Sequence, residues 1–320
     1  METTHLKTLY ARTNTGAIQQ WAVEIGEIFT AKIKLEKFKN MIDINKNYNE
    51  NNLETMAKMP DCFVDLTVTS PPYDGLRTYK GYSFPFEEIA KELYRVTKEQ
   101  GVLVWVVADS VIDGSESGTS FKQALYFKEQ GFNLHDTMIY SKTFLPQNGK
   151  RYNQSFEYMF VFSKGIPKTF NPIKRPYSEK TLQRRKTKYT FNKHRQADDT
   201  GREVKEFGVK QDGVTKENVW HYTVGNMQSS KDKIAFQHPA IFPEQLANDH
   251  IISWSNENDL VYDCFMGSGT TAKMALLNNR KFIGSEISEE YCKIAETRIK
   301  ECGGLFLNSF QTKLSNEAGT

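Results

Sequence analysis

The sequence lacks the features that mark a membrane protein or a secreted one. No uninterrupted apolar run approaches the ~18 residues that a transmembrane helix needs. The first five residues have neither the basic start nor the apolar stretch of a secretory signal. The 320 residues include only four cysteines, and no two of them have C-x-x-C spacing, so we expect neither a disulfide framework nor a metal site. These absences predict a cytoplasmic protein with no membrane partner.

The composition nevertheless supports a large folded core. With 38% apolar residues, the chain is expected to form one main domain with an insertion. Cys62, Cys264 and Cys292 lie in apolar or helical surroundings, and we expect them to be buried and reduced.

One short segment, residues 62–73, carries a distinctive pattern. Residues 62–68 alternate and are rich in β-branched side chains, which predicts a strand. Ser70, Pro71, Pro72 and Tyr73 follow closely, and the prolines end the strand because they cannot donate backbone hydrogen bonds. Such a loop offers a hydroxyl, free carbonyls and an aromatic face to a flat ring that carries an amino group. An isolated Ser-Pro-Pro-Tyr is also typical of a plain turn.

A second motif lies near the carboxyl end of the chain. The pattern predicts a strand over 260–262, a tight turn at Gly267 and Gly269, a helix over 270–279 and a strand over 281–284. Glu286 follows about 20 residues after the glycines, where nucleotide-type sites on doubly wound sheets hold an acid for ribose hydroxyls.

Two phosphate-binding signatures are missing from this second motif. It lacks the third glycine of the dinucleotide fingerprint and the Gly-Lys-Ser/Thr of a triphosphate-binding loop. A ribose-binding acid without phosphate-binding machinery suits S-adenosylmethionine, which contains adenosine but no phosphate. The alternative is that Gly267 and Gly269 form only an ordinary turn between a strand and a helix, with no ligand.

Together, the two motifs resemble those of the DNA amino-methyltransferases. The stretch Asp263-Cys-Phe-Met-Gly-Ser-Gly269 is similar to their cofactor loop, and Thr69-Ser-Pro-Pro-Tyr73 is similar to their catalytic loop in its cytosine-N4 form. The resemblance covers most of residues 41–300. It implies an α/β, Rossmann-like methyltransferase fold, with the catalytic loop ahead of the cofactor loop as in the circularly permuted, beta-type group.

The resemblance also assigns roles to individual residues. It implies S-adenosylmethionine as cofactor, with catalytic roles for Ser70, Pro71, Pro72 and Tyr73. The expected cofactor-binding residues are Asp263, Phe265, Gly267, Ser268, Gly269, Thr270, Glu286, Asn51 and His238. Asn51 departs from the family pattern, which often has an aspartate there, but its amide oxygen can still accept a bond from the adenine amino group.

The net charge of +3 hides an asymmetry along the chain. Residues 164–236 contain 17 Lys and Arg against 8 Asp and Glu, so this stretch carries +9 and the rest of the chain carries −6. A solvated surface loop is the ordinary interpretation of such a segment. The family inserts its target-recognition region between the two halves of the site, which favours DNA binding by basic side chains. The candidates are Arg77, Lys174, Arg175, Arg184, Arg185, Lys188 and Arg195.

The resemblance predicts a division of the chain into five parts. These are a helical extension (1–40, with a helix around 17–36), a catalytic half (41–170), a basic target-recognition insertion (171–236), a cofactor half (237–302) and a flexible tail (303–320). The implied partner is double-stranded DNA, with a cognate restriction endonuclease as a further candidate in a prokaryotic or phage setting. Monomer and dimer both remain open.

The expected reaction is methylation of the N4 amine of a flipped-out cytosine. Methylation at C5 is excluded, because it needs a cysteine that follows a proline and no cysteine here does. Adenine-N6 methylation by the same fold remains an alternative, as do RNA or protein substrates and a non-catalytic DNA-binding protein.

Overall fold

The computed structural model describes residues 42–72, 84–143, 150–181, 213–225 and 227–302. The expected helix around residues 17–36 and the tail after Cys302 lie outside these ranges. No helix in the described part of the chain combines the length and the apolar character needed to cross a bilayer.

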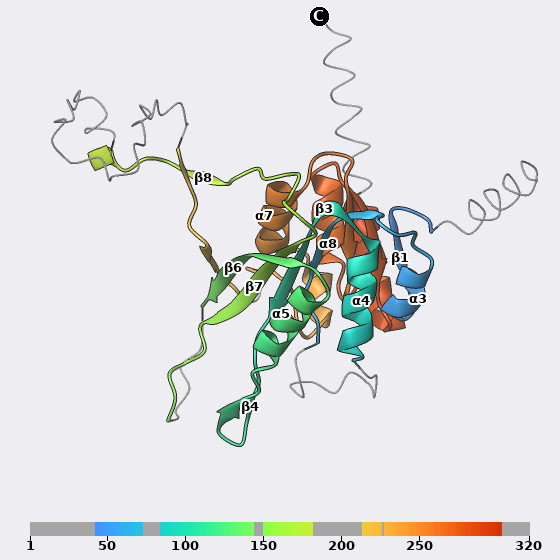
Figure 1. Cartoon of the computed structure of the whole chain (residues 1–320), viewed down its shortest axis with the longest axis horizontal. Coiled ribbons are helices and arrows are strands. Elements are labelled where there is room, and N and C mark those ends of the chain that lie inside the picture. Colours follow the sequence, from blue (N-terminus) through green and yellow to red (C-terminus); the bar gives the residue numbers. More distant parts are fainter. Residues whose placement is uncertain (1–41, 73–83, 144–149, 182–212, 226, 303–320) are drawn as a thin grey trace, which may run out of the picture.

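A central sheet of eight strands organises the molecule (Figure 1). The strands lie side by side in the order β1-β12-β11-β2-β3-β7-β6-β10, and β7 alone among them runs antiparallel to its neighbours. Their bounds are β1 Lys46–Tyr48, β2 Val64–Thr69, β3 Thr97–Val107, β6 Asn133–Lys142, β7 Phe156–Ser163, β10 Val219–Tyr222, β11 Leu260–Asp263 and β12 Lys281–Ser285.

Helices cover both faces of this sheet, and the side chains of β3 show how. Val102, Val104 and Val106 belong to one buried cluster, whereas Leu103 and Trp105 belong to the other, as the alternation of a strand requires. The first cluster includes α7 (Glu244–Trp254), α8 (Thr270–Leu277) and a helix over 289–302, and the second includes α3 (Asn52–Ala57), α4 (Phe86–Val96) and α5 (Thr119–Glu129). The predicted α/β, Rossmann-like fold class is confirmed.

The sequence of α4 shows why these helices face the sheet. Ile89, Leu93 and Val96 are spaced four and three residues apart and are fully buried, so they form one apolar stripe. Glu87 and Glu88 lie in the first turn and Arg95 in the last, which suits the helix dipole. The helix therefore buries the apolar stripe and exposes its charged side.

The elements predicted around the two motifs form with small shifts in their ends. β2 begins at Val64 and β12 extends to Ser285. α8 begins at Thr270 as predicted and ends at Leu277, and Asn279 takes the left-handed conformation with a φ of 59°.

The prediction for Cys62 was wrong. This residue is exposed and lies before β2, with a φ of 53°, whereas Cys264 and Cys292 are buried as predicted. The apolar neighbours of Cys62 in sequence belong to the strand, but the strand begins two residues later.

Smaller elements extend from the sheet. The hairpin of β4 (Val111–Ile112) and β5 (Ser115–Glu116) projects at the bottom of Figure 1, and β8 (Lys174–Arg175) pairs with β9 (Val214–Thr215) at the upper left. The chain then returns to the main sheet as β10, which pairs in parallel with β6, and passes through a 3-10 helix, η1 (Lys233–Gln237), into α7. The carboxyl-terminal part of the predicted insertion thus forms an edge of the central sheet.

Candidate active site

The two sequence motifs meet because β2 and β11 are parallel neighbours in the sheet. Leu66 and Thr67 pair with Val261 and Tyr262, so both strands end at the same edge. At that edge Thr69 Oγ1 donates a hydrogen bond of 2.6 Å to Asp263 Oδ1. The loop that begins at Ser70 and the glycine turn are therefore joined directly.

Asp263 holds the start of the glycine turn. Its carboxylate is buried and also accepts a 3.0 Å hydrogen bond from the backbone N–H of Phe265. Burial raises the pKa of Asp263, while the hydrogen bonds from Thr69, Thr271 and Phe265 act in the opposite direction. The residue thus fixes the backbone at the start of the turn.

Close packing explains both glycines of the turn. Gly267 and Gly269 have φ values of 52° and 81°, in the left-handed region that glycine adopts without strain. A Cβ at Gly269 would lie 2.8 Å from Cα and Cβ of Ala295, and one at Gly267 would lie 3.2 Å from His238 Nε2. The turn passes close to a helix on one side and an imidazole on the other.

Glu286 follows β12 directly and is tied to the same turn. Its two carboxylate oxygens accept 2.8 Å hydrogen bonds from the backbone N–H groups of Gly267 and Ser288. Burial raises the pKa of Glu286, and these backbone hydrogen bonds oppose the rise. A carboxylate has about four lone-pair sites, so Glu286 can still accept a bond from a ligand hydroxyl.

Asn51 and His238 approach the turn from the two faces of the sheet. Asn51 caps the amino end of α3, and its Oδ1 accepts a 2.9 Å bond from the N–H of Leu53. His238 follows η1, its Nδ1 accepts a 3.1 Å bond from the N–H of Ala240, and its ring lies 4.3 Å from that of Tyr291.

A cavity of about 1030 Å³ connects these groups. The predicted residues that line it are Ser70, Pro71, Pro72, Asn51, His238, Asp263, Phe265, Gly267, Ser268, Thr270 and Glu286. Gly269 lies in the same turn and is the N-cap residue that precedes α8. Tyr73 lies outside the described residues. The site thus presents a buried acid and a glycine turn without a lysine that could bind phosphate in the turn, which fits an adenosine-containing ligand.

Comparison with known proteins decides the family. A family model for N6/N4 methyltransferases, described as DNA methylase, matches residues 64–297. The chain belongs to this DNA methylase family. The orphan methyltransferase M.BamHII of Bacillus amyloliquefaciens is 61% identical over 248 residues, which are 75% of this chain and 90% of that protein. The type II methyltransferase M.BglII of Bacillus subtilis is 29% identical over 262 residues, which are 79% of this chain and 68% of that protein.

Solved structures agree on the fold of the methylase. PvuII DNA methyltransferase superposes with a TM-score of 0.57 at 20% identity, over 84% of this chain and 94% of its own. The DNA modification methylase TTHA0409 of Thermus thermophilus, in complex with S-adenosylmethionine, gives 0.52 at 22% identity, over 80% of this chain and 95% of its own. The methylase is an S-adenosylmethionine-dependent DNA methyltransferase of mixed α/β fold.

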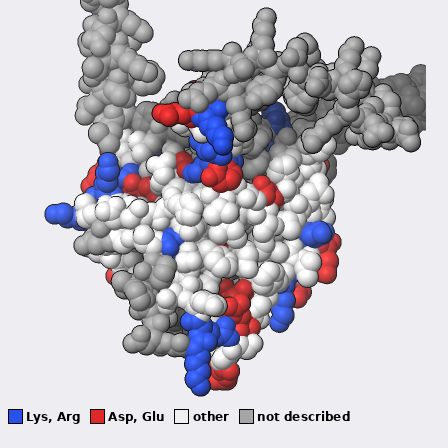
Figure 2. All heavy atoms as spheres, turned by 90° about the vertical axis from the view of Figure 1, so that its left-hand side faces the viewer, with Lys and Arg blue, Asp and Glu red and all other residues white. Residues whose placement is uncertain are grey.

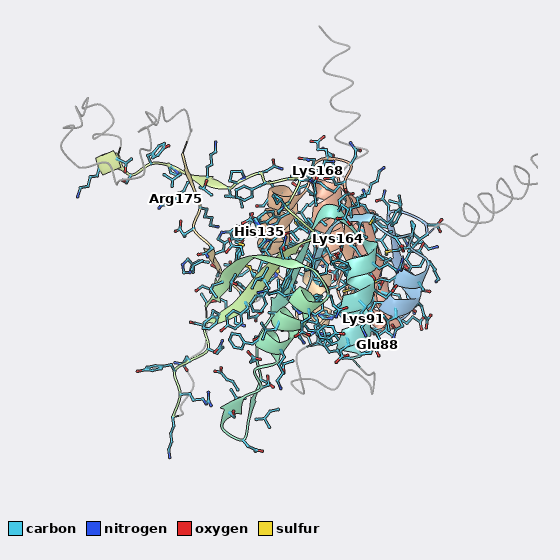
Figure 3. All side chains as sticks on the ribbon, in the orientation of Figure 1. Glu88, Lys91, His135, Lys164, Lys168 and Arg175 are labelled. Carbon is cyan, nitrogen blue, oxygen red and sulfur yellow. The ribbon has the colours of Figure 1, made fainter. Side chains whose placement is uncertain are left out.

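The basic residues predicted to bind DNA are only partly placed. Lys174 and Arg175 are exposed on β8, where Figure 3 labels Arg175. Arg175 Nε lies 3.1 Å from Glu217 Oε2. On the face shown in Figure 2, the described Lys and Arg side chains lie at the margins of a mostly uncharged centre. The other candidates, Arg77, Arg184, Arg185, Lys188 and Arg195, lie outside the described residues.

Arg298, which is not among the residues predicted for the site, donates hydrogen bonds to the glycine turn from the helix over 289–302. Arg298 is fully buried, and its Nη1 donates to Ser268 O at 2.6 Å and to Thr270 Oγ1 at 3.1 Å. The same guanidinium pairs with Asp232 at 2.9 Å and Glu244 at 2.6 Å, and Lys273 Nζ lies 2.7 Å from each of these carboxylates.

The sequence did contain a signal for Arg298. It lies three residues after Ala295, on the buried side of the last described helix, where a charged side chain needs buried partners. Those partners come from the amino end of η1 and from α7, so the pairing itself depends on the fold.

The residues at the far end of the cavity, beyond the catalytic loop, are also not among the predicted site residues. Tyr140, Lys142, Glu157, Val224 and Phe242 line it in addition to the predicted residues. Tyr140 and Lys142 lie at the end of β6, and Glu157 lies at the start of the antiparallel β7. Their proximity follows from strand pairing, which no local pattern in the sequence reveals.

Proposed function

We propose that the methylase transfers a methyl group from S-adenosylmethionine to the N4 amine of cytosine in double-stranded DNA. One observation carries the proposal. Ser70, Pro71 and Pro72 follow β2 directly, line the same cavity as the glycine turn, and are joined to that turn through Thr69 and Asp263. A serine in the first position of this loop is the cytosine-N4 form, and the solved neighbour PvuII DNA methyltransferase is itself described as cytosine-N4-specific.

The cofactor supplies an electrophilic methyl group on a sulfonium. The chain's own residues would hold it through the glycine turn, with Glu286 for the ribose hydroxyls and Asn51 for the adenine amino group, and with His238 beside Gly267. These assignments rest on the resemblance to the family's motifs, and the position of each residue on the cavity wall supports them.

The residues of the catalytic loop act on the amine. The N4 lone pair is delocalised into the ring, so acceptors on its N–H groups favour a tetrahedral nitrogen that attacks the methyl carbon in line. Ser70 Oγ and the Pro71 carbonyl would provide these acceptors and disperse the positive charge that develops on nitrogen. The N–CH3 bond would form as the S–CH3 bond of the sulfonium breaks and leaves a neutral thioether, and the methylated nitrogen would then release one proton to solvent. Since a paired base cannot reach the cavity, the cytosine must leave the duplex, and Tyr73 is proposed to stack on it.

DNA would be held mainly by the basic stretch of residues 171–236. Lys174, Arg175 and the other basic candidates supply charges for phosphates, in the cytoplasm where the DNA lies. A cognate restriction endonuclease is a further candidate partner, although the relative M.BamHII is named an orphan methyltransferase.

Product analysis tests the proposal. The protein, isotopically labelled S-adenosylmethionine and mixed-sequence DNA are incubated together, and the DNA is then digested to nucleosides for mass spectrometry. N4-methylcytosine is expected. N6-methyladenine would establish the alternative reaction, and DNA that stays unlabelled would contradict both. A Ser70→Ala, Tyr73→Ala double variant that still binds DNA serves as the background control.

A further inference from the structure

The cavity extends beyond the residues predicted to bind the cofactor. Its volume, about 1030 Å³, is at the upper end of the ~300–1,000 Å³ typical of small-molecule pockets, and its lining continues past the catalytic loop to the end of β6 and the start of β7. Along the sheet edge, the cofactor half lies over β12 and β11, the catalytic loop follows β2, and β3, β7 and β6 continue beyond it.

The far wall is built from a charged pair on an aromatic support. Lys142 Nζ donates a hydrogen bond to Glu157 Oε1 and lies 5.9 Å from the centre of the Tyr140 ring. Tyr140 is buried and packs against Tyr222 at 5.7 Å, and the hydroxyl of Tyr222 donates to Asp249 at 2.8 Å.

Backbone pairing makes this support rigid. Lys142 is the last residue of β6, its register partner in β10 is Tyr222, and its N–H donates to Ser155 O at 2.9 Å. Tyr140 pairs in register with Glu157 across β6 and β7. Side chains on paired strands are held more precisely than side chains on loops.

The distance between the catalytic loop after β2 and the far wall at the end of β6 suits a flat base between them. β2 and β6 are separated by β3 and β7, so their backbones lie three strand spacings, or about 14 Å, apart. Side chains from the catalytic loop and from β6 narrow that gap, and the side chain of Lys142, which is 27% exposed, lines the cavity.

We propose that Lys142 is a specificity-determining residue that donates to the ring acceptors N3 and O2 of the flipped cytosine. This inference rests on the proposed N4 reaction. Cytosine presents two adjacent acceptors beside its amine, whereas adenine presents one acceptor, N1, and a C–H in place of O2. An ammonium group with three donors matches the cytosine pattern. Glu157 holds the ammonium group and balances its charge in a cavity that also receives a cationic methyl donor.

A combination of a variant and a base analogue tests the contact. Methylation is measured with a duplex that carries one mapped target cytosine, and with the same duplex that carries 3-deazacytosine, in which N3 is replaced by C–H. Wild-type protein and Lys142→Met are compared on both. If Lys142 donates to N3, the loss of kcat/KM caused by the analogue is at least about tenfold smaller in the variant. Intrinsic differences in amine reactivity are common to both proteins and cancel.

Two further variants complete the experiment. Lys142→Arg keeps a cationic donor and should restore part of the sensitivity to the analogue. Lys98→Met is the matched control, since Lys98 forms a comparable pair with Asp65 at 2.7 Å near the opposite edge of the sheet, and it should behave as wild type. Equal losses on both duplexes in Lys142→Met would overturn the inference and indicate a phosphate contact. N6-methyladenine from the wild-type protein would instead refute the proposed function.

Discussion

Replacement of Arg298 should separate cofactor binding from folding. In Arg298→Lys the positive charge beside Asp232 and Glu244 remains, but a single ammonium group cannot reproduce the guanidinium's bonds to Ser268 and Thr270 as well. A hydrogen bond to a charged group contributes about 1.5–3 kcal/mol. If one such contribution to the order of the turn is lost, the affinity for S-adenosylmethionine should fall roughly 10- to 140-fold.

Arg298→Met is the more severe change. Removal of one partner from a buried ion pair costs about 3–5 kcal/mol. The lower end applies here, because Lys273 still lies 2.7 Å from both carboxylates. Hydrogen bonds from Lys273 and Arg298 hold the pKa of Asp232 low despite its burial, so part of this effect survives in the variant. A loss of about 3 kcal/mol is a large share of the ~5–15 kcal/mol by which domains are stable.

Calorimetry of cofactor binding and thermal unfolding would measure the two effects separately. Arg280→Lys is the matched control: Arg280 donates to Ser255 O at 2.6 Å and to Ser255 Oγ at 3.1 Å, away from the glycine turn. It should lower stability and leave the cofactor Kd unchanged. If Arg298→Lys bound S-adenosylmethionine as tightly as wild type, the positioning role of Arg298 would be refuted.

Three other outcomes follow from the site and the core. Ser70→Ala should lower kcat about 10- to 1,000-fold in a single-turnover methylation assay while the cofactor Kd stays within about twofold, because one acceptor for the amine is removed; an equal loss of cofactor binding would argue against a catalytic role. Gly269→Ala should lower the free energy of unfolding by ~1–3 kcal/mol in urea melts, since its φ is 81° and the new methyl group would lie 2.8 Å from Ala295. His250 is fully buried, and desolvation lowers its pKa to about 3. Below a pH of about 6.5 the unfolded chain takes up a proton at His250 that the folded chain does not. The free energy of unfolding therefore decreases as the pH is lowered, by about 1.4 kcal/mol at pH ~5.5. That slope, from chemical denaturation, should be absent in His250→Leu, and an unchanged slope would show that other groups cause it.

The sequence predicted the local parts of the site better than their connections. Alternation and proline placement predicted β2 and the loop after it, and glycine placement predicted the turn before α8. These features depend on a few adjacent residues. The hydrogen bond between Thr69 and Asp263 depends instead on which strands are neighbours, a property of the whole sheet.

Two residues show where local reasoning fails. Cys62 has apolar neighbours in sequence, yet it is exposed because the strand begins only at Val64. Glu157 lies in β7, and its contact with Lys142 requires an antiparallel β7 beside β6, which no local pattern in the sequence reveals. Tertiary packing decides where a helix or strand ends and which strands pair. A local pattern in the sequence carries no information about that packing.

The hydrogen bond between Thr69 and Asp263 has a consequence for how such genes can change. The catalytic loop and the glycine turn are held together across the sheet, by pairing of β2 with β11, and not by the polypeptide that links them. The surface loops within the linking segment can therefore gain or lose residues without separating the two loops. A gene that encoded the two segments in the reverse order could build the same sheet edge, provided the new connections lay at the surface.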